Sequence, residues 1–103
     1  MFKVLIVDDE PFVRDGIKTL VDWKTFGFIL CGEAGDGEEA LEMMDTLEPH
    51  LVITDIKMPV MDGLELIHQC RTDRHAQTKF IILSGYGDFK YAQTAIRYHV
   101  NNY

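Results

Sequence analysis

Short apolar runs alternate along this sequence with longer segments in which apolar residues recur at helical spacing. Four of the runs are rich in β-branched or aromatic residues and almost free of polar positions, which is typical of strands covered on both faces. They are Lys3–Val7, Phe28–Cys31, Leu51–Thr54 and Phe80–Leu83. Polar or turn-forming residues follow each run, including a loop at Glu33–Gly37 after the second. We therefore predict four buried strands.

The segments that follow the strands have the spacing of amphipathic helices. Their apolar faces consist of Val13, Ile17, Leu20 and Val21; then Ala40, Leu41, Met44 and Leu47; then Leu64, Ile67 and Cys70; and finally Phe89, Ala92, Ala95 and Ile96. Pro11 suits the first position of the first helix, and Pro49 should end the second. Four strand–helix units predict an α/β fold of the doubly wound kind, with parallel strands and helices on both faces of the sheet.

The length of 103 residues suits one domain, and 47% apolar residues suffice for a core. The formal net charge is −7, with 17 acidic and 10 basic side chains. This balance argues against direct binding of nucleic acid, whose backbone is gripped mainly by clustered Lys and Arg. It suits an acidic metal site or a basic partner instead.

Cellular location is predicted from the cysteines and from the apolar runs. Cys31 and Cys70 lie far apart within apolar patterns, which favours reduced thiols. No apolar run approaches the length of a membrane span, and Met1 leads directly into the first strand without a signal peptide. We therefore predict a cytoplasmic protein that does not bind membranes.

Residues capable of chemistry follow three of the predicted strands. Asp8 and Asp9 end the first strand, Asp55 follows the third and Ser84 follows the fourth. In an open parallel sheet such residues meet at the carboxyl edge, where ligands bind. Two carboxylates about 4 Å apart repel by roughly 4 kcal/mol at an effective dielectric constant near 20, so three of them favour a bound cation.

A cation at this edge would suit phosphoryl transfer. Mg²⁺ prefers oxygen ligands and is often bound by one or two carboxylates together with a phosphate oxygen. An aspartate can act as the nucleophile and form an aspartyl phosphate, and a hydroxyl such as that of Ser84 can bind the phosphoryl oxygens. Taken singly, each of these residues is more often a helix cap or a solvated loop residue. Their combination at the ends of neighbouring strands favours a site.

Four segments resemble response-regulator receiver domains, and together they cover essentially the whole chain. They are VLIVDDE at Val4–Glu10, EAGDGEEAL at Glu33–Leu41, LVITDIKMPVMDGLEL at Leu51–Leu66, and IILSGYGDF at Ile81–Phe89. The central segment is the most specific. The resemblance implies a flavodoxin-like parallel sheet with strand order 2-1-3-4-5. It also implies a signalling switch rather than an enzyme, although one that assists its own phosphorylation and dephosphorylation.

The resemblance also implies a role for individual residues. Asp55 would accept a phosphoryl group from a sensor histidine kinase in a Mg²⁺-dependent reaction. Asp9 and Asp55 would ligate Mg²⁺ directly, with the backbone carbonyl of Lys57 as a third ligand and Asp8 acting through a metal-bound water. Ser84 would be the hydroxyl of the switch and Tyr103 its aromatic residue.

The last part of the sequence narrows the resemblance. SGYGDFKYAQTAIRYHVNNY is most similar to receivers joined to AraC-type DNA-binding domains. Such a receiver would continue beyond Tyr103 into the rest of a fifth strand, a phosphate-pairing lysine and a fifth helix. We therefore expect residues 1–103 to be a receiver domain without its C-terminal end, whose DNA-binding output domain is absent. A homodimer through the face around the fourth helix is a further expectation.

Three other functions are weighed against this one. A pseudo-receiver that binds partners without being phosphorylated would suit the missing lysine but would not need Asp8, Asp9, Asp55 and Ser84. A phosphatase of the haloacid-dehalogenase type needs an acid two residues after its nucleophile, where this chain has Lys57. A flavin-binding fold is disfavoured because no phosphate-cradling loop follows the first strand.

Overall fold

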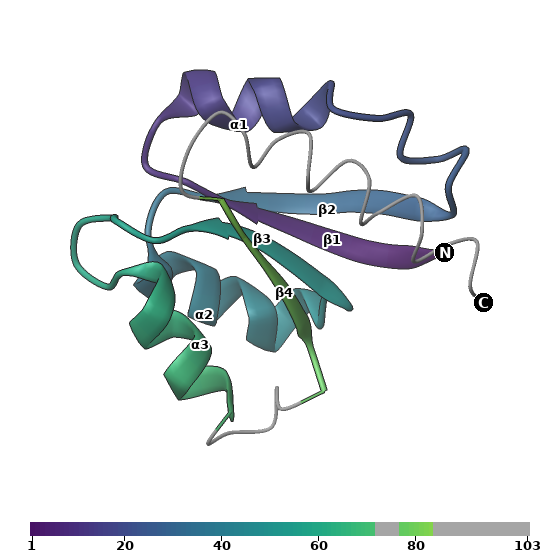
Figure 1. Ribbon diagram of the computed structural model, residues 1–103. Helices are drawn as coiled ribbons and strands as arrows, with labels where there is room; N and C mark the ends of the chain where they lie inside the picture. The colour runs from purple at the N-terminus through teal and green to yellow at the C-terminus, as the bar shows by residue number, and fades with distance from the viewer. Residues whose placement is uncertain (72–76, 84–103) are drawn as a thin grey trace.

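The computed structural model describes residues 1–71 and 77–83, which form a parallel sheet with helices on both sides (Figure 1). The elements in chain order are β1 (Phe2–Val7), α1 (Pro11–Lys18), β2 (Phe28–Ala34), α2 (Gly37–Leu47), β3 (Leu51–Asp55), α3 (Gly63–Arg71) and β4 (Lys79–Leu83). The strand order is β2-β1-β3-β4, and every described pair is parallel. The predicted α/β class and the order 2-1-3-4 are confirmed. The expected fourth helix and fifth strand lie outside the described residues.

The two faces of the sheet are covered by different helices. In Figure 1, α1 lies on one side of the sheet, and α2 and α3 lie on the other. Alternate residues of β1 face the two sides: Val4 and Ile6 pack with Ile17 of α1, while Leu5 and Val7 belong to a second cluster. That second cluster also contains Ala34, Ala40, Met44, Val52, Leu66 and Cys70. Burial on both faces explains why the central strands are nearly all apolar.

Side chains and backbone conformation fix the helix ends. Asp36 Oδ1 accepts a hydrogen bond from the Glu39 N–H at 2.8 Å, which caps α2. Asp62 Oδ1 accepts one from the Glu65 N–H at 2.8 Å, at the start of α3. Glu48 adopts a left-handed conformation at the end of α2, directly before Pro49. The predicted end of the second helix at Pro49 is therefore confirmed.

Three details of the sequence prediction are wrong. The second strand continues through Glu33 and Ala34, because these residues pair with Ile6 and Val7 of β1. The first helix ends at Lys18, so Leu20 and Val21 pack on the core from the segment after it. In α3, Leu64 is 56% exposed, whereas Leu66 is fully buried.

Two further predictions concern the cysteines and membranes. Within the described residues, neither Cys31 nor Cys70 forms a disulfide bond. Within residues 1–71 and 77–83, no helix has the length and apolar character needed to cross a membrane.

Candidate metal centre

Three carboxylates meet at the carboxyl edge of the sheet. Each of Asp8, Asp9 and Asp55 offers one oxygen, and these oxygens all lie within 4.8 Å of one another. The pairing of the strands explains the meeting, since Val7 is the register partner of Thr54 and the acids come directly after this pair. The structure thus brings together the three acids that were expected to share a site.

Asp8 is the most deeply placed of the three acids. It is 4% exposed, and its Oδ1 accepts a hydrogen bond from the Glu10 N–H at 2.9 Å. Burial raises the pKa of Asp8, and the negative charges of Asp55, Asp9 and Glu10 raise it further, while the bond from Glu10 opposes the rise. The ionised form of Asp8 is therefore disfavoured in the fold unless a positive charge is nearby.

Asp55 lies at the end of β3 and is half-buried. Its Oδ1 accepts a hydrogen bond from the Ile56 N–H at 2.7 Å. The chain then returns to this point, because the Gly63 N–H donates to the Ile56 carbonyl at 2.8 Å. A Cβ on Gly63 would lie only 2.1 Å from the Asp55 carbonyl oxygen, so only glycine fits here. This close approach fixes the path of the loop after β3.

The loop between β3 and α3 contains a strained turn. Val60 has a φ of 69°, and the Met61 N–H donates to the Pro59 carbonyl at 2.7 Å. A positive φ together with this hydrogen bond is the pattern of the more strained form of γ-turn, which is unusual for a β-branched residue. The Gly37 N–H donates to the Met61 carbonyl at 3.0 Å, which ties this loop to the start of α2.

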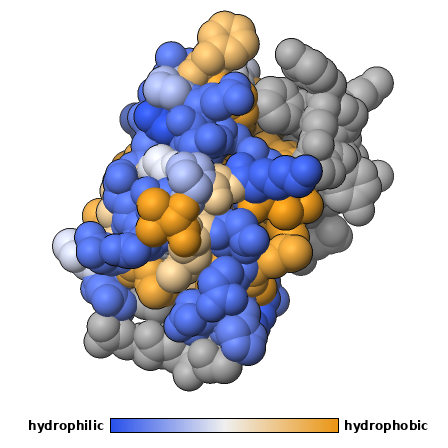
Figure 2. Space-filling model, turned by 90° about the vertical axis from the view of Figure 1, so that its left-hand side faces the viewer, coloured by the Kyte–Doolittle hydropathy of each residue, from blue (hydrophilic) through white to orange (hydrophobic). Residues whose placement is uncertain are grey.

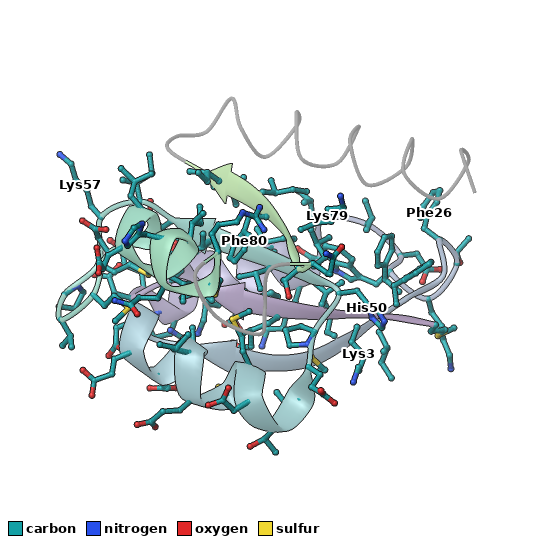
Figure 3. All side chains as sticks on the ribbon, turned by 90° about the horizontal axis from the view of Figure 1, so that it is seen from below. Lys3, Phe26, His50, Lys57, Lys79 and Phe80 are labelled. Carbon is teal, nitrogen blue, oxygen red and sulfur yellow. The ribbon has the colours of Figure 1, made fainter. Side chains whose placement is uncertain are left out.

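The remaining predicted site residues are Lys57, Ser84 and Tyr103. Lys57 is exposed, and its side chain points away from the molecule at the end opposite Lys3 and His50 (Figure 3). This is compatible with the expected role, which uses only the backbone carbonyl of Lys57. Ser84 and Tyr103 lie outside the described residues. Figure 2 faces the carboxyl edge and shows a mostly hydrophilic surface with separate apolar patches.

Two residues next to the acids were missed by sequence reasoning. Arg14 of α1 donates to the backbone carbonyl of Asp8 at 2.6 Å and to Glu33 of β2 at 3.0 Å. Glu33 had been assigned to a loop, and Arg14 had no assigned role. The only available signal was that Arg14 lies one helical turn after Glu10, and this spacing does not identify a contact with a backbone atom.

Comparison with known proteins identifies the family. The family model of the response regulator receiver domain matches residues 4–103. This chain belongs to the response regulator receiver domains. Such domains are signalling modules of two-component systems and bind Mg²⁺ in general, which agrees with the acidic cluster described above. The family predicted from the sequence is confirmed.

Several relatives are transcriptional regulators. The chain is 45% identical over 103 residues to the uncharacterized transcriptional regulatory protein YesN of Bacillus subtilis, and it covers 28% of that protein. It is 42% identical over 103 residues to the transcriptional regulatory protein HptR of Staphylococcus aureus and covers 40% of it. The chain thus spans well under half the length of these relatives.

Solved structures agree with the fold and with the narrower resemblance. The receiver domain of AraT from Geobacillus stearothermophilus matches with a TM-score of 0.77 and 43% identity, over 93% of this chain and 74% of that one. A two-component transcriptional regulator AraC from Clostridium phytofermentans matches with a TM-score of 0.76 and 35% identity, over 95% of this chain and 75% of that one. The relatives thus include AraC-type regulators, as the final segment of the sequence had indicated.

Proposed function

We propose that this chain is a phosphorylation-dependent switch in which Asp55 accepts a phosphoryl group from a sensor histidine kinase. The observation that carries the proposal is the cluster of Asp8, Asp9 and Asp55, whose oxygens lie within 4.8 Å of one another. A carboxylate oxygen of Asp55 attacks the phosphorus of a phosphohistidine, the P–N bond breaks, and the imidazole nitrogen retains the electron pair and takes up a proton. The product is an aspartyl phosphate.

The donor set fits Mg²⁺. Carboxylate oxygens are hard ligands, and the raised pKa of Asp8 marks a site that favours a positive charge. Asp9, Asp55 and the backbone carbonyl of Lys57 would hold the ion, with Asp8 beside them. When bound, Mg²⁺ supplies charge neutralisation for the phosphoryl oxygens. The chain's own residues orient Asp55: the Ile56 N–H holds one carboxylate oxygen in place at 2.7 Å.

The output side of the proposal rests on residues outside the described ranges. Ser84 would bind the phosphoryl group, and Tyr103 with the fourth-helix face would carry the change to an output. Because YesN and HptR are transcriptional regulators by name, we propose regulation of transcription through a DNA-binding domain that is not part of this chain. The same proposal includes a cytoplasmic location, a receiver domain over residues 1–103 and a homodimer.

Acetyl phosphate and mass spectrometry test the phosphoacceptor. The chain is incubated with acetyl phosphate and Mg²⁺, and the intact mass is measured. We expect one phosphoryl adduct that Asp55→Asn abolishes, while Asp45→Asn, at an exposed aspartate of α2, leaves it unchanged. An adduct that survives Asp55→Asn would contradict the assignment. Absence of any adduct would favour the pseudo-receiver, and steady turnover of many phosphate esters would favour the phosphatase.

A further inference from the structure

Arg14 connects two backbone elements beside the acidic cluster. Its Nη1 donates to the Asp8 carbonyl oxygen at 2.6 Å, and its Nε donates to Glu33 Oε1 at 3.0 Å. The guanidinium group is planar and rigid, so two bonds in different directions fix its orientation. The Arg14 side chain is only 19% exposed, which limits competition from water. We call this pair of contacts the Arg14–Glu33 bridge.

The carbonyl that Arg14 contacts belongs to the peptide group between Asp8 and Asp9. Two other hydrogen bonds hold the same loop: the Asp8 N–H donates to the Ala34 carbonyl at 3.0 Å, and the Glu10 N–H donates to Asp8 Oδ1 at 2.9 Å. Neither of these bonds fixes the carbonyl of Asp8. A rotation of that peptide plane would move the exposed Asp9 relative to Asp55, and the contact with Arg14 opposes such a rotation.

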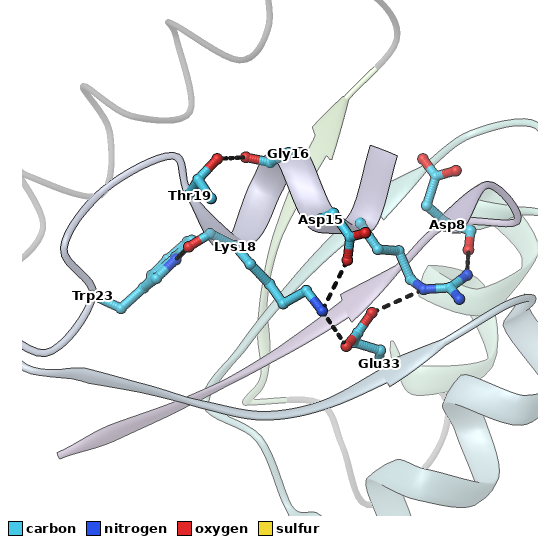
Figure 4. A network of polar contacts seen from close by, with 8 residues as sticks. Asp8, Asp15, Gly16, Lys18, Thr19, Trp23 and Glu33 are labelled. Atoms are coloured by element: carbon cyan, nitrogen blue, oxygen red, sulfur yellow. Dashed lines mark hydrogen bonds and ion pairs between the residues drawn. The ribbon is translucent and has the colours of Figure 1, made fainter. Parts of the chain in front are cut away.

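Glu33 connects the bridge to β2 and to Lys18. It lies in β2, opposite Ile6 of the buried strand β1. Its second oxygen, Oε2, accepts a hydrogen bond from Lys18 Nζ at 2.8 Å, and Lys18 also pairs with Asp15 at 3.0 Å (Figure 4). Glu33 therefore has both oxygens occupied and holds Arg14 from a strand that is paired with β1.

We infer that Arg14, held by Glu33, is a positioning residue that sets the geometry of cation binding by Asp9 and Asp55. The inference rests on the proposed function, since it takes the acidic cluster to be the cation site. A lysine at position 14 would keep the positive charge but lacks the fork of donors that reaches the two acceptors in different directions. The bridge should therefore depend on the shape of arginine as well as on its charge.

Calorimetric titration with Mg²⁺ tests the bridge without reference to phosphorylation. Groups that orient metal ligands change metal affinity by about 10–100-fold when they are mutated. We expect Arg14→Lys and Glu33→Ala each to weaken Mg²⁺ binding by about 10-fold or more on this basis. Glu33→Gln, whose amide oxygen can still accept from Arg14 Nε, should bind within about three-fold of the wild type. The double variant Arg14→Lys/Glu33→Ala should bind like Arg14→Lys alone, because both changes break one bridge.

Two control variants separate the bridge from general effects. Arg71→Lys makes the same substitution at another arginine that donates to a backbone carbonyl, that of Thr78 at 3.1 Å. Asp15→Asn changes an exposed carboxylate that belongs to the same polar network and pairs with Lys18. Both controls should bind Mg²⁺ within about two-fold of the wild type, as expected for sites without a role in ligand orientation. Urea unfolding without metal shows which variants are folded.

The outcomes distinguish this inference from the proposed function. Wild-type affinity in folded Arg14→Lys, or an equal loss in Arg71→Lys, overturns the inference while the proposed function stands. Absence of Mg²⁺ binding by the wild type overturns both. Because Arg14→Lys and Glu33→Ala break the bridge from opposite ends, either folded variant decides the question.

Discussion

Replacing Asp8 by asparagine should make the metal-free protein more stable. The carboxylate oxygens of Asp8, Asp9 and Asp55 lie within 4.8 Å of one another, and Asp8 is almost completely buried. At that distance two unit charges repel by about 3.5 kcal/mol at an effective dielectric constant near 20 and by about 1 kcal/mol in water. Asp8→Asn removes two such repulsions and the desolvation of one charge, and it leaves the repulsion between Asp9 and Asp55.

A partial loss offsets this gain. The Glu10 N–H now donates to a carboxylate, and a hydrogen bond to a charged acceptor is roughly twice as strong as one to the neutral amide oxygen of asparagine. Asp9 is also exposed, so its repulsion lies near the value for water. We therefore expect Asp8→Asn to raise the free energy of unfolding by about 1–2 kcal/mol at pH 7 in EDTA. For a domain of this size, each kcal/mol raises Tm by roughly 4–8 °C.

Urea unfolding followed by Trp23 fluorescence measures this difference. Trp23 is the single tryptophan and is 6% exposed, so its emission should report loss of the core. Saturating Mg²⁺ should reverse the ranking, because binding at 100 times the dissociation constant adds about 2.7 kcal/mol and Asp8→Asn should bind more weakly. Glu42→Gln, at an exposed glutamate of α2, should change neither measurement. If Asp8→Asn is no more stable than the wild type in EDTA, the electrostatic reasoning is refuted.

The pH dependence of this difference has a definite sign. The pKa of Asp8 is raised above its ordinary value of 3.8, first by burial and then by the neighbouring acids. Protonation of Asp8 therefore contributes fully to the free energy of unfolding below pH 3.8, and this stabilisation is lost as the pH rises through the raised pKa. The advantage of Asp8→Asn should therefore grow between acidic and neutral pH and vanish at the acidic end.

Three further predictions concern backbone and charge at the same edge. In urea unfolding, Gly63→Ala should destabilise the fold by about 3 kcal/mol, because the added Cβ would overlap the Asp55 carbonyl. The control Gly35→Ala should cost under about 1 kcal/mol, since the nearest atoms to a Cβ there lie at 4.0 Å. Equal effects of the two substitutions would argue against the close approach at Gly63. Val60→Asn should stabilise by about 1 kcal/mol in the same assay, because asparagine tolerates a positive φ, and a loss of stability would contradict the strain. The pKa of Glu33 is lowered by hydrogen bonds from Lys18 and then Arg14, so ionised Glu33 stabilises the fold above pH 4.5, and this stabilisation is lost as the pH falls through the lowered pKa. The urea midpoint of Glu33→Gln should therefore decline less in acid than that of the wild type. Parallel declines of the two midpoints would refute this.

The main features of the fold were predictable because burial on two faces leaves a strong mark on a strand. Residues 4–7 and 51–53, for example, are apolar throughout, since both faces of the sheet are covered. Strand and helix boundaries were less predictable. Polar Glu33 belongs to β2 because it pairs with Ile6 of β1, and this long-range pairing overrides its local character. Leu64 and Leu66 are equally apolar, and the position of α3 against the sheet decides which one is buried.

The meeting of the acids was predictable, whereas their support was not. Asp8, Asp9 and Asp55 follow strands whose carboxyl ends must share an edge in a parallel sheet. Arg14 acts through a backbone carbonyl, which any residue at position 8 would provide, so no pair of side chains reveals the contact. The turn at Val60 was equally hidden, because valine is a poor candidate for a positive φ.

Crystals of this chain soaked in Mn²⁺, examined by anomalous diffraction, test the central claim most directly. Mn²⁺ prefers the same oxygen ligands as Mg²⁺ and gives a measurable anomalous signal. The account predicts one strong peak between the carboxylates of Asp8, Asp9 and Asp55, which disappears in Asp55→Asn. A peak at another group of acids, or none at this edge in ordered crystals, would contradict it.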